Sequence, residues 1–149
     1  MIHEYTLQPS PTRTGDKLHS DLPGYAEGLW TPNVGGNATY LVQEGTYTKI
    51  GRMVFITGII QINAIGTGST NVISGLPFPS RDSPTGNGSI CFVVRALTSV
   101  TAIVSIVGDL GNNQSDISLR SRVAANASDA LNAIFQNSTI VEITGFYPI

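Results

Sequence analysis

The longest strand signal in the chain is the run from Met53 to Ile62, where almost every residue is β-branched, aromatic or otherwise apolar. Gly58 is its one small break. This composition suits a pleated, half-buried surface, and the apolar residues show no 3.6-residue repeat. The run therefore predicts a long β-strand around which the rest of the chain is organised.

Glycine-rich turns flank this strand. Before it, Lys49-Ile50-Gly51-Arg52 interrupts the apolar pattern as a turn or bulge would, because glycine can take backbone angles closed to other residues. After it, Gly66-Thr67-Gly68-Ser69 reverses the chain, and we expect Asn71–Leu76 to return as the second strand of a central hairpin. Pro77 has no N–H to donate to a ladder, so the second strand should end there.

The later part of the chain carries further short strand patterns. Ile90–Leu97 and Thr101–Val107 are nearly continuous apolar runs, as expected for a hairpin of strands covered on both faces. Ser115–Val123 and Ser138–Tyr147 alternate, the first with Ile117, Leu119 and Val123 on one face and the second with Val141, Ile143 and Tyr147. Ala124–Gln136 is the one helix-compatible segment, with one or two turns burying Leu131, Ile134 and Phe135.

About eight strands at spacings of roughly 8 to 15 residues predict an all-β fold, an antiparallel β-sandwich or jelly-roll-like head domain. Residues 1–27 differ, because they contain Pro9, Pro11 and Pro23 and show no sustained periodicity. We expect an extended N-terminal arm over 1–27, with one short strand at Ile2–Leu7, and a head over 28–149. The arm either packs along a neighbouring subunit or larger assembly, or is a loosely ordered terminus.

The composition limits the possible partners. The chain has 149 residues, which fits one domain, and only 12% of them are charged, about half the usual share. A surface rich in hydroxyls and amides is covered by neighbouring subunits, binds polar ligands such as sugars, or simply belongs to an uncharged, turn-rich β fold. The formal net charge of −2 argues against a nucleic-acid partner.

No segment indicates export or membrane insertion. Met1–Thr14 lacks a basic start followed by an apolar core, and no apolar run reaches the length of a membrane helix. We therefore expect a protein that is made and folded in a cytosol. A virion component released by lysis would fit this expectation.

Five short motifs occur in a fixed order along most of the chain. They are Gly28-x-Trp30-Thr31-Pro32, Tyr47-Thr48-Lys49-Ile50-Gly51, Val54-x-x-x-Gly58, Ile73-x-Gly75-Leu76-Pro77-Phe78 and Gly145-x-Tyr147. This ordered set resembles a module found near the C-terminal ends of tail fibres and other receptor-binding or structural proteins of bacteriophages and some large viruses. The resemblance implies a β-sandwich head that forms trimers, belongs to a virion and displays loops to a host surface.

Two loop-like stretches are candidates for ligand binding, Pro79–Gly88 and Gly108–Gln114, unless they are solvated connections. Arg120 and Arg122 lie side by side on the polar face of their strand. They either grip an acidic sugar or phosphate or pair with an acidic residue of a neighbouring strand. Our candidate ligand-binding residues are Arg81, Asp82, Asn87, Asp109, Asn112, Asn113, Arg120 and Arg122.

Apolar residues on both faces of Ile90–Val107 are more than a lone sandwich of this size can cover, which predicts a homotrimer. For Trp30 we expect a place in the core or at a subunit interface rather than a sugar-stacking role. The candidate interface residues are Trp30, Ile90, Phe92, Val94 and Ile103.

The sequence gives little support for catalysis. His3 and His19 both lie in the arm, too few for a metal site and badly placed for a nucleophile–base pair. A glycosidase needs two carboxyls flanking one bond, and no local motif favours a pair among Asp82, Asp109, Asp116, Asp129 and Glu142.

We therefore expect neither an enzyme nor a cofactor or metal. The leading hypothesis is a receptor-binding head whose partner is a host-surface glycan. A structural cap or decoration that contacts other virion proteins is the alternative, and a polysaccharide-cleaving enzyme is the third.

Overall fold

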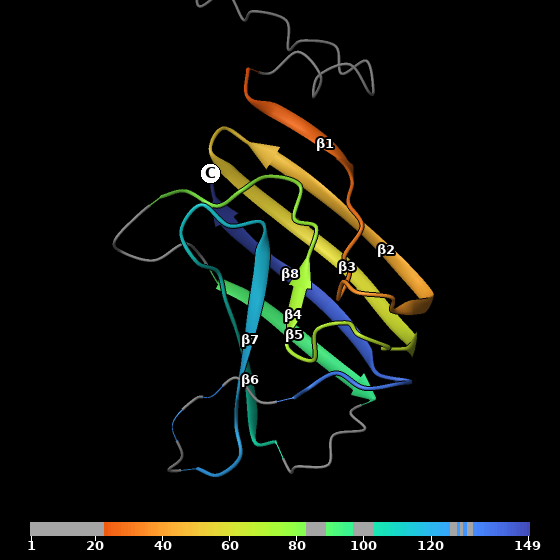
Figure 1. Cartoon of the computed structure of the whole chain (residues 1–149). Helices are drawn as coiled ribbons and strands as arrows, with labels where there is room; N and C mark the ends of the chain where they lie inside the picture. The colour runs from red at the N-terminus through yellow and green to blue at the C-terminus, as the bar shows by residue number, and fades with distance from the viewer. Residues whose placement is uncertain (1–22, 83–88, 97–102, 126–127, 129, 131–132) are drawn as a thin grey trace, which may run out of the picture.

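The computed structural model describes residues 23–82, 89–96, 103–125, 128, 130 and 133–149. These residues form antiparallel β-strands and no helix (Figure 1). The strands are β1 (Tyr25–Leu29), β2 (Thr39–Ile50), β3 (Met53–Ala64), β4 (Val72–Ser74), β5 (Ser89–Ala96), β6 (Ser105–Asp109), β7 (Asp116–Arg122) and β8 (Ile140–Pro148). The all-β prediction is confirmed.

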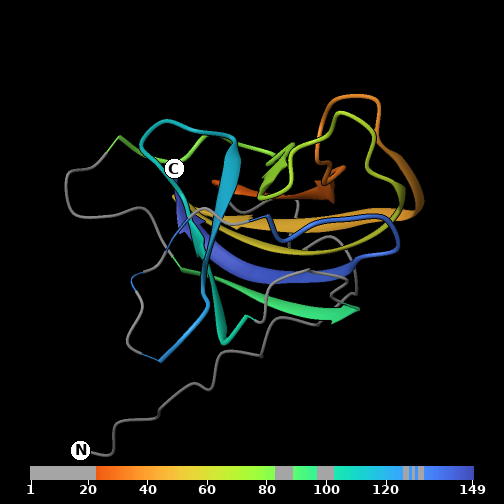
Figure 2. The ribbon, with the colours of Figure 1, turned by 60° about the horizontal axis from the view of Figure 1, so that its bottom comes forward.

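The strands pair in the order β1-β2-β3-β8-β5-β6-β7-β4. β5 and β6 share one partner pair, Ile90 with Gly108, and there the fold passes from one layer to the other. We call β1-β2-β3-β8-β5 the main sheet and β6-β7-β4 the cover sheet. Figures 1 and 2 show β4 and β7 lying over one face of the main sheet, which makes a β-sandwich as predicted. Its jelly-roll-like character stays a prediction.

β3 is the strand predicted from the Met53–Ile62 run, but its neighbours differ from the expected ones. Its hairpin partner is β2, joined through a tight turn in which Gly51 has a φ of 58°. The expected return strand forms as β4, yet β4 pairs with β7 in the cover sheet. The predicted hairpin of β3 and β4 is wrong because an apolar pattern identifies a strand and its buried face, not the strand beside it.

The core lies between the two sheets. Alternate residues of β3 and β8 point into it, as the period of two predicts for strands with one covered face. Val123 is an exception to the predicted pattern, since β7 ends at Arg122 and Val123 is 41% exposed. The main-sheet residues of the core are Val54, Ile56, Ile60, Ile62, Val141, Ile143 and Tyr147, and the cover-sheet residues are Ile73, Ile117 and Leu119.

Ile134 and Phe135 fill the core without a helix. Both are fully buried, as expected, but their backbone N–H groups donate to the carbonyl oxygen of Thr70 at 2.7 and 2.8 Å. The helical turns expected within Ala124–Gln136 are absent from the described residues of that segment. Hydrogen bonds to a distant loop therefore replace those of a helix, and Leu131 lies outside the described residues.

Trp30 follows β1 and is buried in the core, with 5% of its surface exposed. Its Nε1 donates to the carbonyl oxygen of Thr57 at 2.8 Å. Trp30 therefore belongs to the core of its own chain, as expected, and a place at a subunit interface stays a prediction.

The main sheet begins before the expected start of the head. β1 opens at Tyr25, so Tyr25, Ala26 and Glu27, which we assigned to the arm, pair with β2. The strand expected at Ile2–Leu7 lies outside the described residues.

Candidate functional site

Two of the predicted loops meet at one corner of the sandwich. Ser80, which is 3% exposed, donates its hydroxyl to the carbonyl oxygen of Gly111 and accepts a bond from the N–H of Gln114 at 3.0 Å. The N–H of Ser80 donates to the carbonyl oxygen of Gln114 at 2.8 Å. Ser80 therefore joins residues 79–82 to residues 110–114.

The β2–β3 turn and the last residues of the chain complete this corner. The N–H of Arg81 donates to the carbonyl oxygen of Pro148 at 2.9 Å, and that of Ile149 donates to the carbonyl oxygen of Arg52 at 2.8 Å. Arg52 Nε donates in return to the carbonyl oxygen of Ile149 at 3.1 Å. Figure 1 shows the C-terminus, the β2–β3 turn and both loops at the same end of the molecule.

These segments enclose an open groove of about 520 Å³, which we call the corner groove. Three of its lining side chains are cationic and one is acidic. It is lined by Lys49, Gly51, Arg52, Phe78, Pro79, Ser80, Arg81, Asp82, Asn113 and Ile149.

Two tyrosines, Tyr47 and Tyr147, contact Phe78 of the groove lining. Its ring meets that of Tyr47 edge to face at 5.4 Å between centroids, and its carbonyl oxygen accepts a bond from the Tyr147 hydroxyl at 3.0 Å. Burial raises the pKa of Tyr147 to about 12, so the phenol stays protonated and keeps donating at neutral pH. The apolar part of the groove is thus anchored to the core.

Asn113 lies in the left-handed region of backbone space, with a φ of 52°. Asparagine adopts this conformation more readily than most residues other than glycine, at some cost. Backbone conformations of this kind cluster at binding sites and tight turns. Here the conformation places an exposed amide in the wall of the corner groove.

The structure brings together part of the predicted ligand site. Arg81, Asp82 and Asn113 line the corner groove, and Asn112 is exposed beside Asn113 in the same loop. Asn87 lies outside the described residues. Lys49 and Arg52 were missed, although two cations around a turn glycine between two strands were visible in the sequence.

The other predicted residues lie elsewhere. Arg120 Nε and Asp109 Oδ2 form an exposed ion pair of 3.0 Å between β7 and β6, as the strand-pairing alternative predicted, and a ligand-binding role of Arg120 stays a prediction. Arg122 is at the end of β7 and does not line the corner groove.

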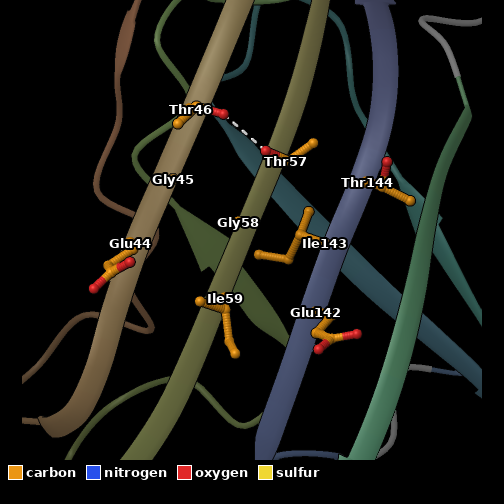
Figure 3. A pocket seen from close by; sticks show the side chains of 9 residues that line it. All are labelled: Glu44, Gly45, Thr46, Thr57, Gly58, Ile59, Glu142, Ile143 and Thr144. Atoms are coloured by element: carbon orange, nitrogen blue, oxygen red, sulfur yellow. Dashed lines mark hydrogen bonds between the residues drawn. The ribbon is translucent and has the colours of Figure 1, made fainter.

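The outer face of the main sheet, which the cover sheet leaves open, carries a second hollow of about 440 Å³ (Figure 3). Glu44, Ile59 and Glu142 form one row across β2, β3 and β8, and Thr46, Thr57 and Thr144 form the next. The hydroxyl oxygens of Thr46 and Thr57 are 2.8 Å apart. Glu44 and Glu142 are separated by two strand spacings, roughly 9.6 Å between backbones. Glu44 was not among the carboxylates considered from the sequence.

Large apolar side chains also lie on this outer face. Phe55 of β3 and Phe146 of β8 are paired in register, 6.1 Å apart between ring centroids, and are 45% and 47% exposed. Leu29 of β1 and Ile50 of β2 are exposed as well. Within the described part of the chain, the main sheet therefore has a face that the cover sheet leaves open and that is partly apolar.

The other predicted interface residues lie in or next to β5 and β6. Ile103 is half-buried and packs against the core of its own chain. The backbones of Ile90, Phe92 and Val94 pair with Gly145, Ile143 and Val141 of β8.

Among residues 23–82, 89–96, 103–125, 128, 130 and 133–149, no group of three or more His, Cys, Asp or Glu side chains is placed to hold a metal ion. The same residues contain no helix long and apolar enough to cross a membrane.

No family model matches the chain, and a comparison with curated proteins gives no match. Among solved structures, the chain is similar to the crystal structure of the Dettilon tailspike protein, with a TM-score of 0.58 and 15% sequence identity. The similarity covers 83% of this chain but only 24% of the tailspike chain. At this identity it is the fold that is shared, and the β-sandwich described above resembles one part of a phage tailspike protein.

Proposed function

We propose that this chain is the head domain of a phage tail-fibre or tailspike protein, a virion component that forms trimers and binds a host-surface carbohydrate in the corner groove. The observation that carries the proposal is the corner itself. The β2–β3 turn, residues 78–82, residue 113 and the C-terminal strand converge there from distant parts of the sequence. The shared fold with a tailspike protein supports the same role.

The groove suits a polymer rather than a small enclosed ligand. It is open to solvent, so a ligand bound there can extend beyond the groove. Its lining combines an aromatic residue, an amide group and charges, the mixture that binding sites use to orient a polar ligand. Loops held on a rigid sheet are a common place for such residues.

The outer face of the main sheet is the proposed trimer interface. Strand spacings of ~4.8 Å and a rise of ~3.3 Å per residue give this sheet roughly 700 Å². That is close to the ~800 Å² that each partner contributes to a standard interface. Exposed Phe55 and Phe146 supply apolar contacts on this face. Association there leaves the corner groove accessible, because the groove is at the end of the strands.

The test is a glycan array probed with the intact oligomer. The double variant Arg81→Ala/Asn113→Ala should lose the bound glycans, since both side chains line the groove. Arg120→Ala, which removes a charge outside the groove, should keep the same pattern. Absence of glycan binding by the unmodified oligomer would leave the structural cap as the better proposal, and electron microscopy of particles with and without the protein would examine that role.

The outer-face hollow favours a second candidate, cleavage of a polysaccharide. Inverting glycosidases hold two carboxyls ~6.5–9.5 Å apart across the scissile bond, and Glu44 and Glu142 flank Ile59 on neighbouring strands. An interface on this face would bury both carboxylates, so the two uses exclude each other. Shorter polysaccharide products that disappear in Glu44→Gln and Glu142→Gln would establish the enzyme and remove the outer-face interface.

A further inference from the structure

We infer that the corner groove takes an anionic polymer, whose repeating unit carries a carboxylate or phosphate group held by Lys49, Arg52 and Arg81. This inference rests on the proposed function and names the ligand class of the same groove. It is carried by the distribution of charge over the chain and by the way the cationic side chains are fixed.

Positive charge is concentrated in the groove against the balance of the whole chain. The sequence has 8 Lys and Arg against 10 Asp and Glu. Lys49, Arg52 and Arg81 all line this one groove, while Asp82 is the only acidic side chain among its lining residues. The sign of the groove is therefore opposite to the net charge of −2. A cleft lined by one sign of charge attracts ligands of the other sign.

The cationic side chains are held by the protein while keeping donors for a ligand. Lys49 Nζ donates to the carbonyl oxygen of Gly24 at 3.3 Å, and Arg52 Nε donates to that of Ile149 at 3.1 Å. An ammonium has three N–H donors and a guanidinium has five, so each of these contacts uses only one. Side chains fixed in advance lose less conformational freedom when a ligand binds.

Arg81 is positioned through its backbone. Its N–H is bonded to Pro148, its neighbour Ser80 is bonded to Gly111 and Gln114, and the side chain itself is half-buried. A guanidinium whose backbone is fixed in this way suits the planar, bidentate recognition of carboxylate or phosphate oxygens.

The second hollow has the opposite character. Glu44 and Glu142 are the ionisable side chains of its lining, and no cation lines it. Of the outer-face hollow and the corner groove, only the corner groove therefore has the positive charge to hold an anionic group.

The experiment measures binding of three polymers to the intact protein by calorimetry. Polygalacturonate supplies carboxylates, poly(glycerol phosphate) supplies phosphates, and dextran is neutral. We expect at least one anionic polymer to bind and dextran not to saturate. Affinity should fall between ~0.01 M and ~0.15 M salt, because counterions screen exposed charges.

Variants assign the binding to the groove. Lys49→Ala, Arg52→Ala and Arg81→Ala should each weaken binding of the anionic polymer roughly tenfold. Arg120→Ala removes the same charge from an exposed ion pair outside the groove and should change binding less than about twofold. Asp82→Asn should strengthen binding roughly threefold by removing the negative charge of the acidic side chain in the lining. A variant that merely unfolded could not produce that gain.

The outcomes separate the inference from the proposed function. Binding of only one anionic polymer identifies carboxylate or phosphate as the recognised group. If dextran binds as tightly as the anionic polymers and Arg81→Ala/Asn113→Ala weakens the binding of both, the anionic inference is overturned while carbohydrate binding in the groove stands. If none of the three polymers binds and the glycan array also shows no binding, the anionic inference and the proposed carbohydrate-binding function are both refuted.

Discussion

The indole of Trp30 lies directly against Gly45 of β2. The backbone N–H of Trp30 donates to the carbonyl oxygen of Gly45 at 3.0 Å, and a Cβ atom at position 45 would overlap the indole nitrogen. Gly58, paired with Gly45 on β3, borders the same ring, and a Cβ there would lie 3.1 Å from it. Because these two paired glycines have no side chains, they leave the space in which the indole packs against the main sheet.

Gly45→Ala should therefore destabilise the protein by about 2–3 kcal/mol. The added methyl group would push the buried indole away and break its bond to Thr57, and overpacking of a core has costs of this order. Urea unfolding midpoints measure the effect. Gly111→Ala is the control, since its methyl group would meet only the end of the flexible Gln114 side chain. Equal midpoints for the two variants would contradict the claim that Gly45 is needed to make space for the indole.

Ser80→Ala should loosen the corner groove. The change removes the partner of the Gln114 N–H and of the Gly111 carbonyl oxygen, which costs about 1–2 kcal/mol. Affinity for the bound polymer should fall as well, because Ser80 positions both loops. Calorimetry and urea unfolding are read together, with the exposed Ser105→Ala as control. Lower stability with unchanged affinity would show that Ser80 does not shape the site.

Phe55→Ser combined with Phe146→Ser should convert the proposed trimer into single chains. Both rings are exposed on the outer face of the main sheet, and their loss removes most of the aromatic contact available there. Light scattering gives the mass. Val104→Ser, at a 62% exposed position that precedes the cover sheet, should leave the mass unchanged. A single-chain mass for the unmodified protein would refute the trimer itself.

Tyr147 should make stability fall at alkaline pH. Burial raises its pKa from 10.0 to about 12, so the folded state holds the phenolic proton more tightly than the unfolded state does. Its contribution is therefore complete below pH 10.0 and is lost as the pH rises to about 12. Two pKa units correspond to about 2–3 kcal/mol.

Tyr147→Phe isolates this effect from the other tyrosines. At about pH 8 the variant should be less stable by about 1 kcal/mol, because the Phe78 carbonyl oxygen loses its donor. At about pH 12 the order should reverse, since the variant has no phenol to ionise. A stability difference that is the same at both pH values would show that Tyr147 titrates normally.

The strands could be predicted from the sequence because they depend on local chemistry. The run from Met53 and the alternation after Ser115 each identified a strand and its buried face, and both are found in β3 and β7. Which strands are neighbours depends on contacts between distant residues. The alternation of β4 is the same whether it pairs with β3 or with β7, so the choice was not available locally.

The site could be predicted only in part, for the same reason. Loop composition identified Arg81, Asp82 and Asn113, but Lys49 and Arg52 join them only because the β2–β3 turn folds next to the C-terminus. Arg120 had two alternatives that sequence spacing could not separate. Its pairing with Asp109 depends on the register of β6 against β7, in which Asp109 lies opposite Ser118.

The corner groove keeps its shape through main-chain bonds, those of Ser80 with Gln114, Arg81 with Pro148 and Ile149 with Arg52. These three bonds form with any side chain other than proline at the donor position, and only the additional bonds of the Ser80 hydroxyl depend on a side chain. Form and chemistry at this end of the molecule are thus inherited separately. Under the proposed function, the groups displayed in the groove could therefore be exchanged one at a time to fit a new host polymer, with no need to rebuild the scaffold that displays them.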